Sequence, residues 1–146
     1  MNIKNFLTKE QQDQITQAIA EAEKKTSGEI RVHLEKKCKK TPEKRAIEIF
    51  NQLKMFTTAQ RNGSLIYIAV EDRKFAIIGD KGINESVPDD FWDSIRDQMK
   101  LAFSKNDYTT GIVQGINAIG EKLKQHFPYQ SNDTNELTDE ISFNND

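Results

Sequence analysis

Residues 64–70, Ser-Leu-Ile-Tyr-Ile-Ala-Val, decide how the rest of the sequence is interpreted. Nearly all of them are apolar, which is typical of a strand that is covered on both faces of a sheet. The turn signal Asn62-Gly63 precedes this strand, and the polar residues 71–74 follow it. A second apolar run, residues 75–78, comes directly after that short break. The two runs are therefore predicted to form an antiparallel hairpin.

A third predicted strand lies earlier in the sequence, at residues 29–35. Apolar and polar residues alternate along it, which indicates a strand with one buried face. A helix that opens at Thr41-Pro42 separates this strand from residues 64–70, with proline at its first position. Two strands joined through a helix are expected to lie parallel, with a right-handed crossover.

Helices are predicted before and after these strands. The first is capped by Thr8 and stops near Gly28, because glycine commonly ends helices. Two more follow the hairpin: one starts near Ser86, and the other starts near Asp107 and ends before Pro128. The predicted order is helix, strand, helix, strand, strand, helix, helix. This order gives an α/β fold, a mixed sheet with helices on both faces.

The folded domain is expected to span residues 1–128, a length that suits one domain with a core of its own. Residues 129–146 hold five acids, no Lys or Arg, and several Ser and Asn residues. A segment of this composition has too little apolar surface to order itself. It is therefore predicted to be a disordered acidic tail.

The composition argues against several classes of function. The formal net charge is −2, or +3 without the five acids of the tail, and neither value suits a nucleic-acid-binding domain. The one cysteine, Cys38, allows no intramolecular disulfide, which fits a reducing compartment. Residues 1–7 lack the apolar run of a signal peptide, and no stretch approaches the roughly 18 apolar residues of a membrane span. We expect a cytoplasmic monomer without membrane insertion.

Several short segments stand out by their order and spacing between Leu7 and Pro128. They are Gly28-Glu29-Ile30, Asn62-Gly63 before Leu65–Ala69, Asp72-Arg73, Gly82-Ile83, Phe103, Tyr108 and Gly111-Ile112. In these segments the chain resembles the TPM domain family, named after a thylakoid lumen protein, a photosystem II repair protein and a nematode receptor modulator. The resemblance implies a three-layer α/β/α sandwich, divalent-metal binding and, from a plant type of member, acid phosphatase activity. The chain departs from the family pattern at Asp80, where others often have Gly, and at Asn84, where others often have an acid.

Candidate metal ligands gather at one edge of the predicted sheet. Glu29 begins the first strand, Asn62 precedes the second and Asp80 follows the third, so all three should lie at the same edge. Asp89, at the start of the next helix, is expected nearby. Carboxylates together with loop carbonyls suit Ca²⁺ or Mg²⁺. Plainer readings are a turn residue for Asp80 and a favourable helix N-terminal charge for Asp89.

The opposite edge carries Asp72 and Arg73 in the predicted hairpin. In α/β sheets ligands usually bind beyond the carboxyl ends of the parallel strands, and this is that edge. The plainer reading is an exposed ion pair between the two residues, which would contribute less than about 1 kcal/mol.

Three functions are consistent with the sequence. The first is a module that binds Ca²⁺ or Mg²⁺ and acts through a protein partner. The second is a metal-dependent phosphatase, with Glu29 or Asp80 as a ligand of the ion that activates water. The third is a pure interaction domain whose tail residues Leu137, Ile141 and Phe143 form a short docking motif that folds on binding.

Overall fold

The computed structural model describes residues 2–130 and 135–144 of the chain. Within them the sheet has four strands, in the spatial order β3-β2-β1-β4. The strands are β1 (Glu29–Glu35), β2 (Gly63–Ala69), β3 (Lys74–Gly79) and β4 (Ser142–Asn144). β1 lies parallel to β2 and to β4, and β3 lies antiparallel to β2. The predicted hairpin and the predicted parallel pair are therefore both confirmed.

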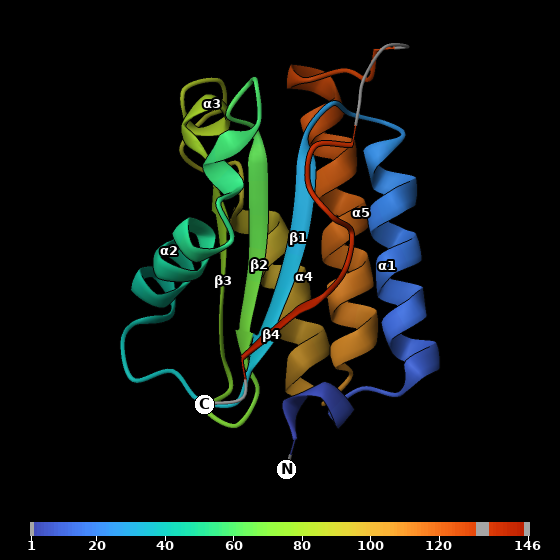
Figure 1. Ribbon diagram of the computed structural model, residues 1–146, viewed down its shortest axis with the longest axis vertical. Helices are drawn as coiled ribbons and strands as arrows, with labels where there is room; N and C mark the ends of the chain where they lie inside the picture. The colour runs from blue at the N-terminus through green and yellow to red at the C-terminus, as the bar shows by residue number, and fades with distance from the viewer. Residues whose placement is uncertain (1, 131–134, 145–146) are drawn as a thin grey trace.

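Helices cover both faces of the sheet (Figure 1). They are α1 (Lys9–Glu23), α2 (Pro42–Gln52), α3 (Lys81–Asn84), α4 (Asp93–Ser104) and α5 (Tyr108–His126), with short 3-10 turns η1 (Ile3–Asn5) and η2 (Met55–Thr57). α1, α4 and α5 enclose the larger core on one face, and α2 encloses a smaller core on the other, over β2 and β3. The predicted α/β fold, with a mixed sheet between helical layers, is confirmed.

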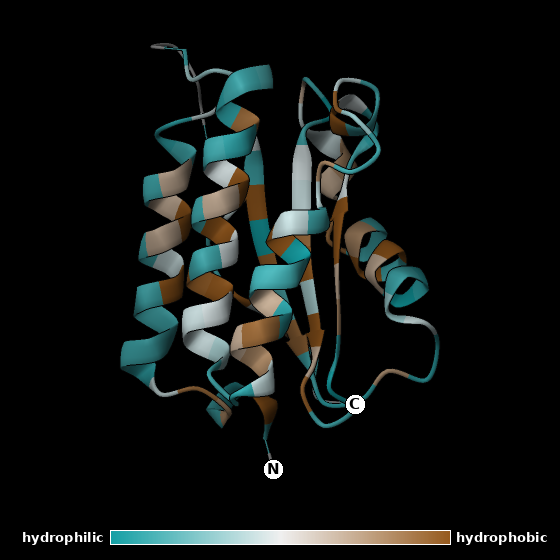
Figure 2. Cartoon of the chain, turned by 180° about the vertical axis from the view of Figure 1, so that it is seen from behind, coloured by the Kyte–Doolittle hydropathy of each residue, from teal (hydrophilic) through white to brown (hydrophobic). Residues whose placement is uncertain are grey.

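α1 shows how local sequence produces this packing. The Thr8 hydroxyl accepts a hydrogen bond from Gln11 N at 3.1 Å, which confirms the predicted cap, and the Gln11 side chain accepts one from Thr8 N at 2.9 Å, which completes a capping box. Seen from behind, α1 is hydrophilic along most of its length, and its hydrophobic residues lie on the side toward α5 (Figure 2). None of the helices in the described part of the chain combines the length and the apolarity that a membrane crossing requires.

The region after β3 differs from the prediction. The sequence indicated a tight loop followed by a helix from Ser86, whereas the structure has the short α3 and a later start of α4, at Asp93. Asp80 caps α3 by accepting a hydrogen bond from Lys81 N at 2.7 Å. The Ser86 hydroxyl donates back to Gly82 O at 2.8 Å. Ser86 therefore closes α3 instead of capping the next helix.

Residues 135–144 differ from the predicted disordered tail. They run over β1 on the face that α2 leaves open and end in β4 (Figure 1). Leu137 packs against the smaller core, and Ile141 and Phe143 pack against the larger one. The composition of the tail suggested disorder, but its few apolar residues are spaced so that each reaches a core. The disorder predicted for residues 131–134 and 145–146 lies outside the described residues.

Candidate functional site

The N-terminal end of β1 meets β2 and β3 at one edge of the sheet. Glu29 is the register partner of Gly63, and Glu29 N donates to Asn62 O at 3.3 Å. Asp80 N donates to Gly63 O at 2.9 Å. The structure therefore brings Glu29, Asn62 and Asp80 to the same edge of the sheet, although their side chains have different partners.

The Asp80 carboxylate is already paired with a cation. It accepts hydrogen bonds from Arg61 Nε at 2.8 Å and from Arg61 Nη2 at 2.9 Å, in addition to the bond that caps α3. Such a bidentate pair fixes both oxygens of the carboxylate. Asp89 lies exposed in the turn before α4. That Asp80 and Asp89 bind a metal stays a prediction.

Three carboxylates converge beside the N-terminal end of β1. Glu23 from the end of α1, Glu29 from β1 and Asp139 from the C-terminal segment line one cavity of about 250 Å³. We call this site the acid cavity. Its other lining residues are Ala20, Lys24, Thr26, Ser27, Tyr129 and Asn135. No ion pair joins any of the three carboxylates to a Lys or Arg among the described residues.

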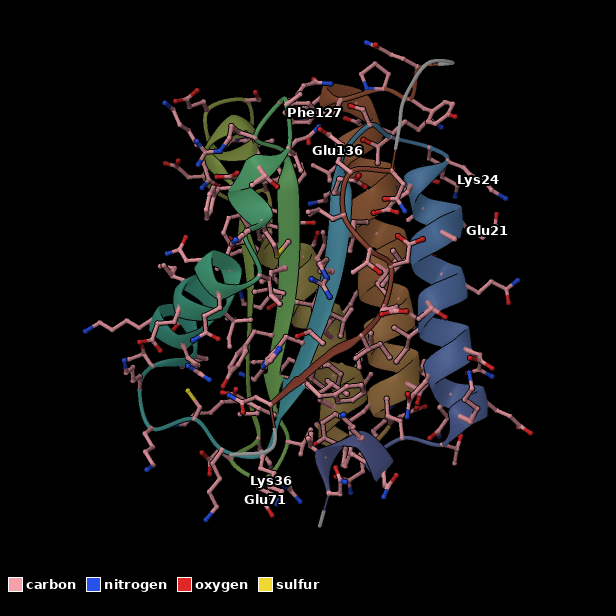
Figure 3. The ribbon with its side chains drawn as sticks, in the orientation of Figure 1. Glu21, Lys24, Lys36, Glu71, Phe127 and Glu136 are labelled. Atoms are coloured by element: carbon pink, nitrogen blue, oxygen red, sulfur yellow. The ribbon has the colours of Figure 1, made fainter. Side chains whose placement is uncertain are left out.

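Hydrogen bonds hold two of these carboxylates in place. The Glu29 side chain is 3% exposed, and its Oε1 accepts hydrogen bonds from Glu136 N and from Leu137 N. Glu136 lies beside this end of β1 (Figure 3). Glu23 Oε2 accepts from Ile30 N at 2.9 Å. The acid cavity is thus built jointly by α1, β1 and the C-terminal segment.

The proximity of these carboxylates changes their proton affinity. Burial, followed by hydrogen bonding to Asp139 and to Glu29, raises the pKa of Glu23 to about 11. Burial also raises the pKa of Glu29. At neutral pH Glu23 therefore holds a proton that its acidic neighbours share. Across residues 2–130 and 135–144, no group of three or more His, Cys, Asp and Glu side chains is spaced to hold a metal ion as it stands.

Asn62 adds a buried amide oxygen near this edge of the sheet. Its side chain is 1% exposed, and its Nδ2 donates weakly to Ser27 Oγ at 3.4 Å. Its Oδ1 is buried without a partner in the described part of the chain. A buried amide oxygen of this kind is one that a water molecule or a cation can satisfy.

A second polar cluster lies further along β1, on the same face as Glu29. The Glu35 carboxylate, 2% exposed, accepts hydrogen bonds from Arg45 Nε at 2.8 Å, from Arg45 Nη2 at 3.0 Å and from the Tyr67 hydroxyl. His33 Nε2 lies 3.1 Å from the same carboxylate, and His33 Nδ1 lies 2.9 Å from Ser142 Oγ on β4.

This cluster keeps Glu35 ionised. Burial alone would raise the pKa of Glu35, but hydrogen bonds from His33, Arg45 and Tyr67 outweigh it and lower the pKa to about 2. Since this carboxylate carries no proton, His33 Nε2 donates to it, and His33 Nδ1 forms its hydrogen bond with the Ser142 hydroxyl. Ser142, His33 and Glu35 thus follow one another as the nucleophile, the base and the acid do in a catalytic triad. Because His33 is only 2% exposed, what the arrangement does in this structure is to fasten β4 to β1.

The opposite edge of the sheet has different contacts. Glu71 N donates to Lys36 O at 2.8 Å, and both residues lie at this end of the sheet in Figure 3. Asp72 accepts a hydrogen bond from Cys38 N at 2.7 Å. Arg73 is exposed and has a left-handed backbone, with φ of 53°. Asp72 and Arg73 form no ion pair with each other among the described residues, so the structure does not show the pair of the plainer reading. That the two residues form a site stays a prediction.

Sequence reasoning missed two members of the acid cavity. Glu23 lies six residues before Glu29, across the turn at Gly28, and this close spacing of two acids was the available signal. Asp139 gave no signal, because only the three-dimensional path of the C-terminal segment brings it there. The Glu35 cluster was missed because the polar face of β1 was expected to be exposed, whereas the whole strand is buried.

Comparison with known proteins agrees with this architecture. The chain matches the family model described as TPM domain (TPM_phosphatase) over residues 2–122. No curated protein matches it. The BA42 protein from the psychrophilic bacterium Bizionia argentinensis, solved by NMR, is 48% identical, with a TM-score of 0.92 over 97% of this chain and 98% of that chain.

Two more distant structures share the fold. The N-terminal domain of the cg2496 protein from Corynebacterium glutamicum is 16% identical, with a TM-score of 0.65 over 80% of this chain and 74% of that one. The N-terminal domain of a protein from P. gingivalis is 18% identical, with a TM-score of 0.68 over 85% of this chain and 82% of that one. With the family match extending over most of its length, this chain belongs to the TPM domain family.

Proposed function

We propose that this chain is a divalent-cation-binding TPM domain that acts through a protein partner, and that Ca²⁺ or Mg²⁺ binds in the acid cavity. One observation carries the proposal: Glu23, Glu29 and Asp139 share a cavity, and none of them forms an ion pair with a Lys or Arg of the described residues, because Lys24, which also lines the cavity, pairs with Glu21. Clustered carboxylates of this kind are stable when they share protons or when a cation lies between them.

The donor chemistry fits a hard cation. Three carboxylates supply the oxygen ligands that Ca²⁺ and Mg²⁺ prefer, and Asn62 Oδ1 is a further oxygen at this edge that has no hydrogen-bond partner among the described residues. The present spacing is that of protonated, hydrogen-bonded acids. A cation must therefore displace the proton of Glu23, and the side chains must reorient around the ion. Cation affinity should consequently increase with pH.

A titration of CaCl₂ and of MgCl₂ into ¹⁵N-labelled protein tests the proposal. We expect saturable amide shifts centred on Glu23, Glu29 and Asp139, stronger at pH 8 than at pH 6. Glu23→Gln should abolish them. The matched control is Glu10→Gln, an exposed acid in the first turn of the same helix, at the end opposite to Glu23. Saturable shifts centred on Asp80 would move the site there, and no saturable shift at millimolar cation would refute cation binding.

Phosphatase activity is the alternative, and the description of the matching family favours it. In that case a bound ion supplies Lewis-acid activation of a phosphoryl group, with Glu29 or Asp80 as a ligand. Hydrolysis of p-nitrophenyl phosphate by the full chain, with Mg²⁺ present, measures this activity. Equal background release by the wild type, Glu29→Gln and Asp80→Asn would count against it.

A further inference from the structure

The open side of β1 recognises the main chain of the segment that covers it. The Glu29 carboxylate accepts from two consecutive amides, Glu136 N and Leu137 N. Arg31 Nη2 donates to Glu140 O at 3.2 Å. β1 then pairs in parallel with β4, with Leu34 opposite Phe143. On the side of the covering segment these contacts involve backbone groups only. Any extended segment that runs parallel to β1 can therefore make them.

Side-chain contacts of the covering segment add sequence preference to the backbone contacts. Leu137 packs against the smaller core, close to Gly63, and Ile141 and Phe143 pack against the larger core. Between the last two, the Ser142 hydroxyl meets His33 Nδ1 at 2.9 Å. The groove therefore selects an aliphatic residue, then, four positions later, an aliphatic, hydroxyl and aromatic triplet.

The segment is an imperfect occupant of this groove. Among the described residues β4 pairs with β1 at three positions, and the residues of β4 are half-buried. Asp139 places a third acid in the cavity that Glu23 and Glu29 already line, and no ion pair joins any of the three to a Lys or Arg of the described residues. Arg31 is 9% exposed, and its Nε is buried without a hydrogen-bond partner in the described part of the chain. An occupant without the acid, and with an acceptor for Arg31 Nε, would bind this surface better.

We propose that the open side of β1 is a peptide-binding groove that residues 135–144 fill, and that an extended segment of a partner protein takes their place. This segment runs parallel to β1. It carries the aliphatic residue and the triplet described above and has a neutral residue where this chain has Asp139. The inference goes beyond the proposed function, because strand addition at β1 requires no cation.

Competition between an added peptide and the attached segment tests the groove. The probe is a fluorescein-labelled peptide with the sequence of residues 135–144, added to the full chain. Phe143→Ala weakens the attached segment, and Leu101→Ala, which removes an exposed apolar side chain of α4, is the matched control. The attached segment competes at an effective concentration of about millimolar. We therefore expect the peptide to bind Phe143→Ala at least about tenfold more tightly than the wild type or Leu101→Ala.

Amide shifts locate the peptide and complete the test. Binding should shift His33, Leu34 and Glu35, and a peptide carrying Asp139→Asn should bind more tightly than the unaltered one. Equal affinity for all three proteins, shifts away from β1, or no binding by a folded Phe143→Ala would overturn the proposal. If Phe143→Ala fails to fold, Ile141→Ala replaces it under the same criteria. A wild-type dimer that Phe143→Ala dissociates would assign the groove to a second copy of this chain and so overturn the partner assignment.

Discussion

Replacing Arg45 with leucine probes the buried carboxylate of Glu35 on β1. The substitution removes two N–H donors, at 2.8 and 3.0 Å, from a side chain that is 2% exposed. Glu35 keeps its bonds from His33 and Tyr67 but loses the charge of the guanidinium. A buried charge deprived of its partner costs about 3–5 kcal/mol.

The pKa of Glu35 gives a second estimate of the stability that its partners contribute. The cluster lowers this pKa from 4.5 to about 2, and a lowering of that size corresponds to about 3 kcal/mol. Because the folded pKa is below the unfolded one, this stability is present above pH 4.5 and is lost as the pH falls toward 2. This free energy belongs to His33, Arg45 and Tyr67 together, so it is an upper bound for Arg45. We therefore expect Arg45→Leu to lose up to about 3 kcal/mol at pH 7, and at pH 3 less than about half of the loss at pH 7.

Urea unfolding followed by circular dichroism measures both values. Arg96→Leu is the matched control, because the Arg96–Asp93 pair, at 3.1 Å, is exposed and should contribute less than about 1 kcal/mol. An Arg45→Leu loss below about 1 kcal/mol, or a loss that is the same at both pH values, would refute the reasoning.

Three further predictions test other parts of the structure. Gly82→Ala places a Cβ 2.1 Å from Gln60 O and 2.7 Å from Arg61 O, so the backbone must move, and thermal unfolding should show a loss of about 1–3 kcal/mol. Glu23, with a folded pKa of about 11 against 4.5, keeps a proton that the unfolded chain releases. Wild-type stability should therefore fall as the pH rises from 5 to 9, and a Glu23→Gln variant with the same slope would contradict this cause. Thr8→Ala removes the N-cap of α1 and should lower the free energy of unfolding by about 1 kcal/mol; an unchanged urea midpoint would show that the cap is dispensable.

The strands that depend on local sequence could be predicted. Residues 64–70 are apolar enough to identify a central strand, and the short polar break after them leaves room for a hairpin only. The edge that holds Glu29, Asn62 and Asp80 followed from this topology, because strand direction fixes which ends meet. The order and the direction of the strands follow from patterns of neighbouring residues, which can be recognised in a single sequence.

The contacts between distant segments could not be predicted. Asp139 reaches Glu23 only because residues 135–144 run back over β1, and the average composition of that segment suggested disorder. Likewise, Arg45 is ten residues from Glu35 and belongs to another element, so their pairing depends on how α2 packs on the sheet. The start of α4 was missed because the Ser86 hydroxyl bonds backward to Gly82. In the first two cases the contact depends on how separate elements pack together, and a local sequence pattern does not contain this information.

The pairing of β4 with β1 also bears on the order of folding. His33 and Ser142 are 109 positions apart in the sequence, whereas β2 and β3 are joined by a short turn. Closing so long a loop costs chain entropy before any contact is gained, and non-local strand pairing is slow. We expect β1, β2, β3 and the helices to collapse first and β4 to join last. Refolding kinetics should then contain a late phase that reports on the edge of the sheet alone.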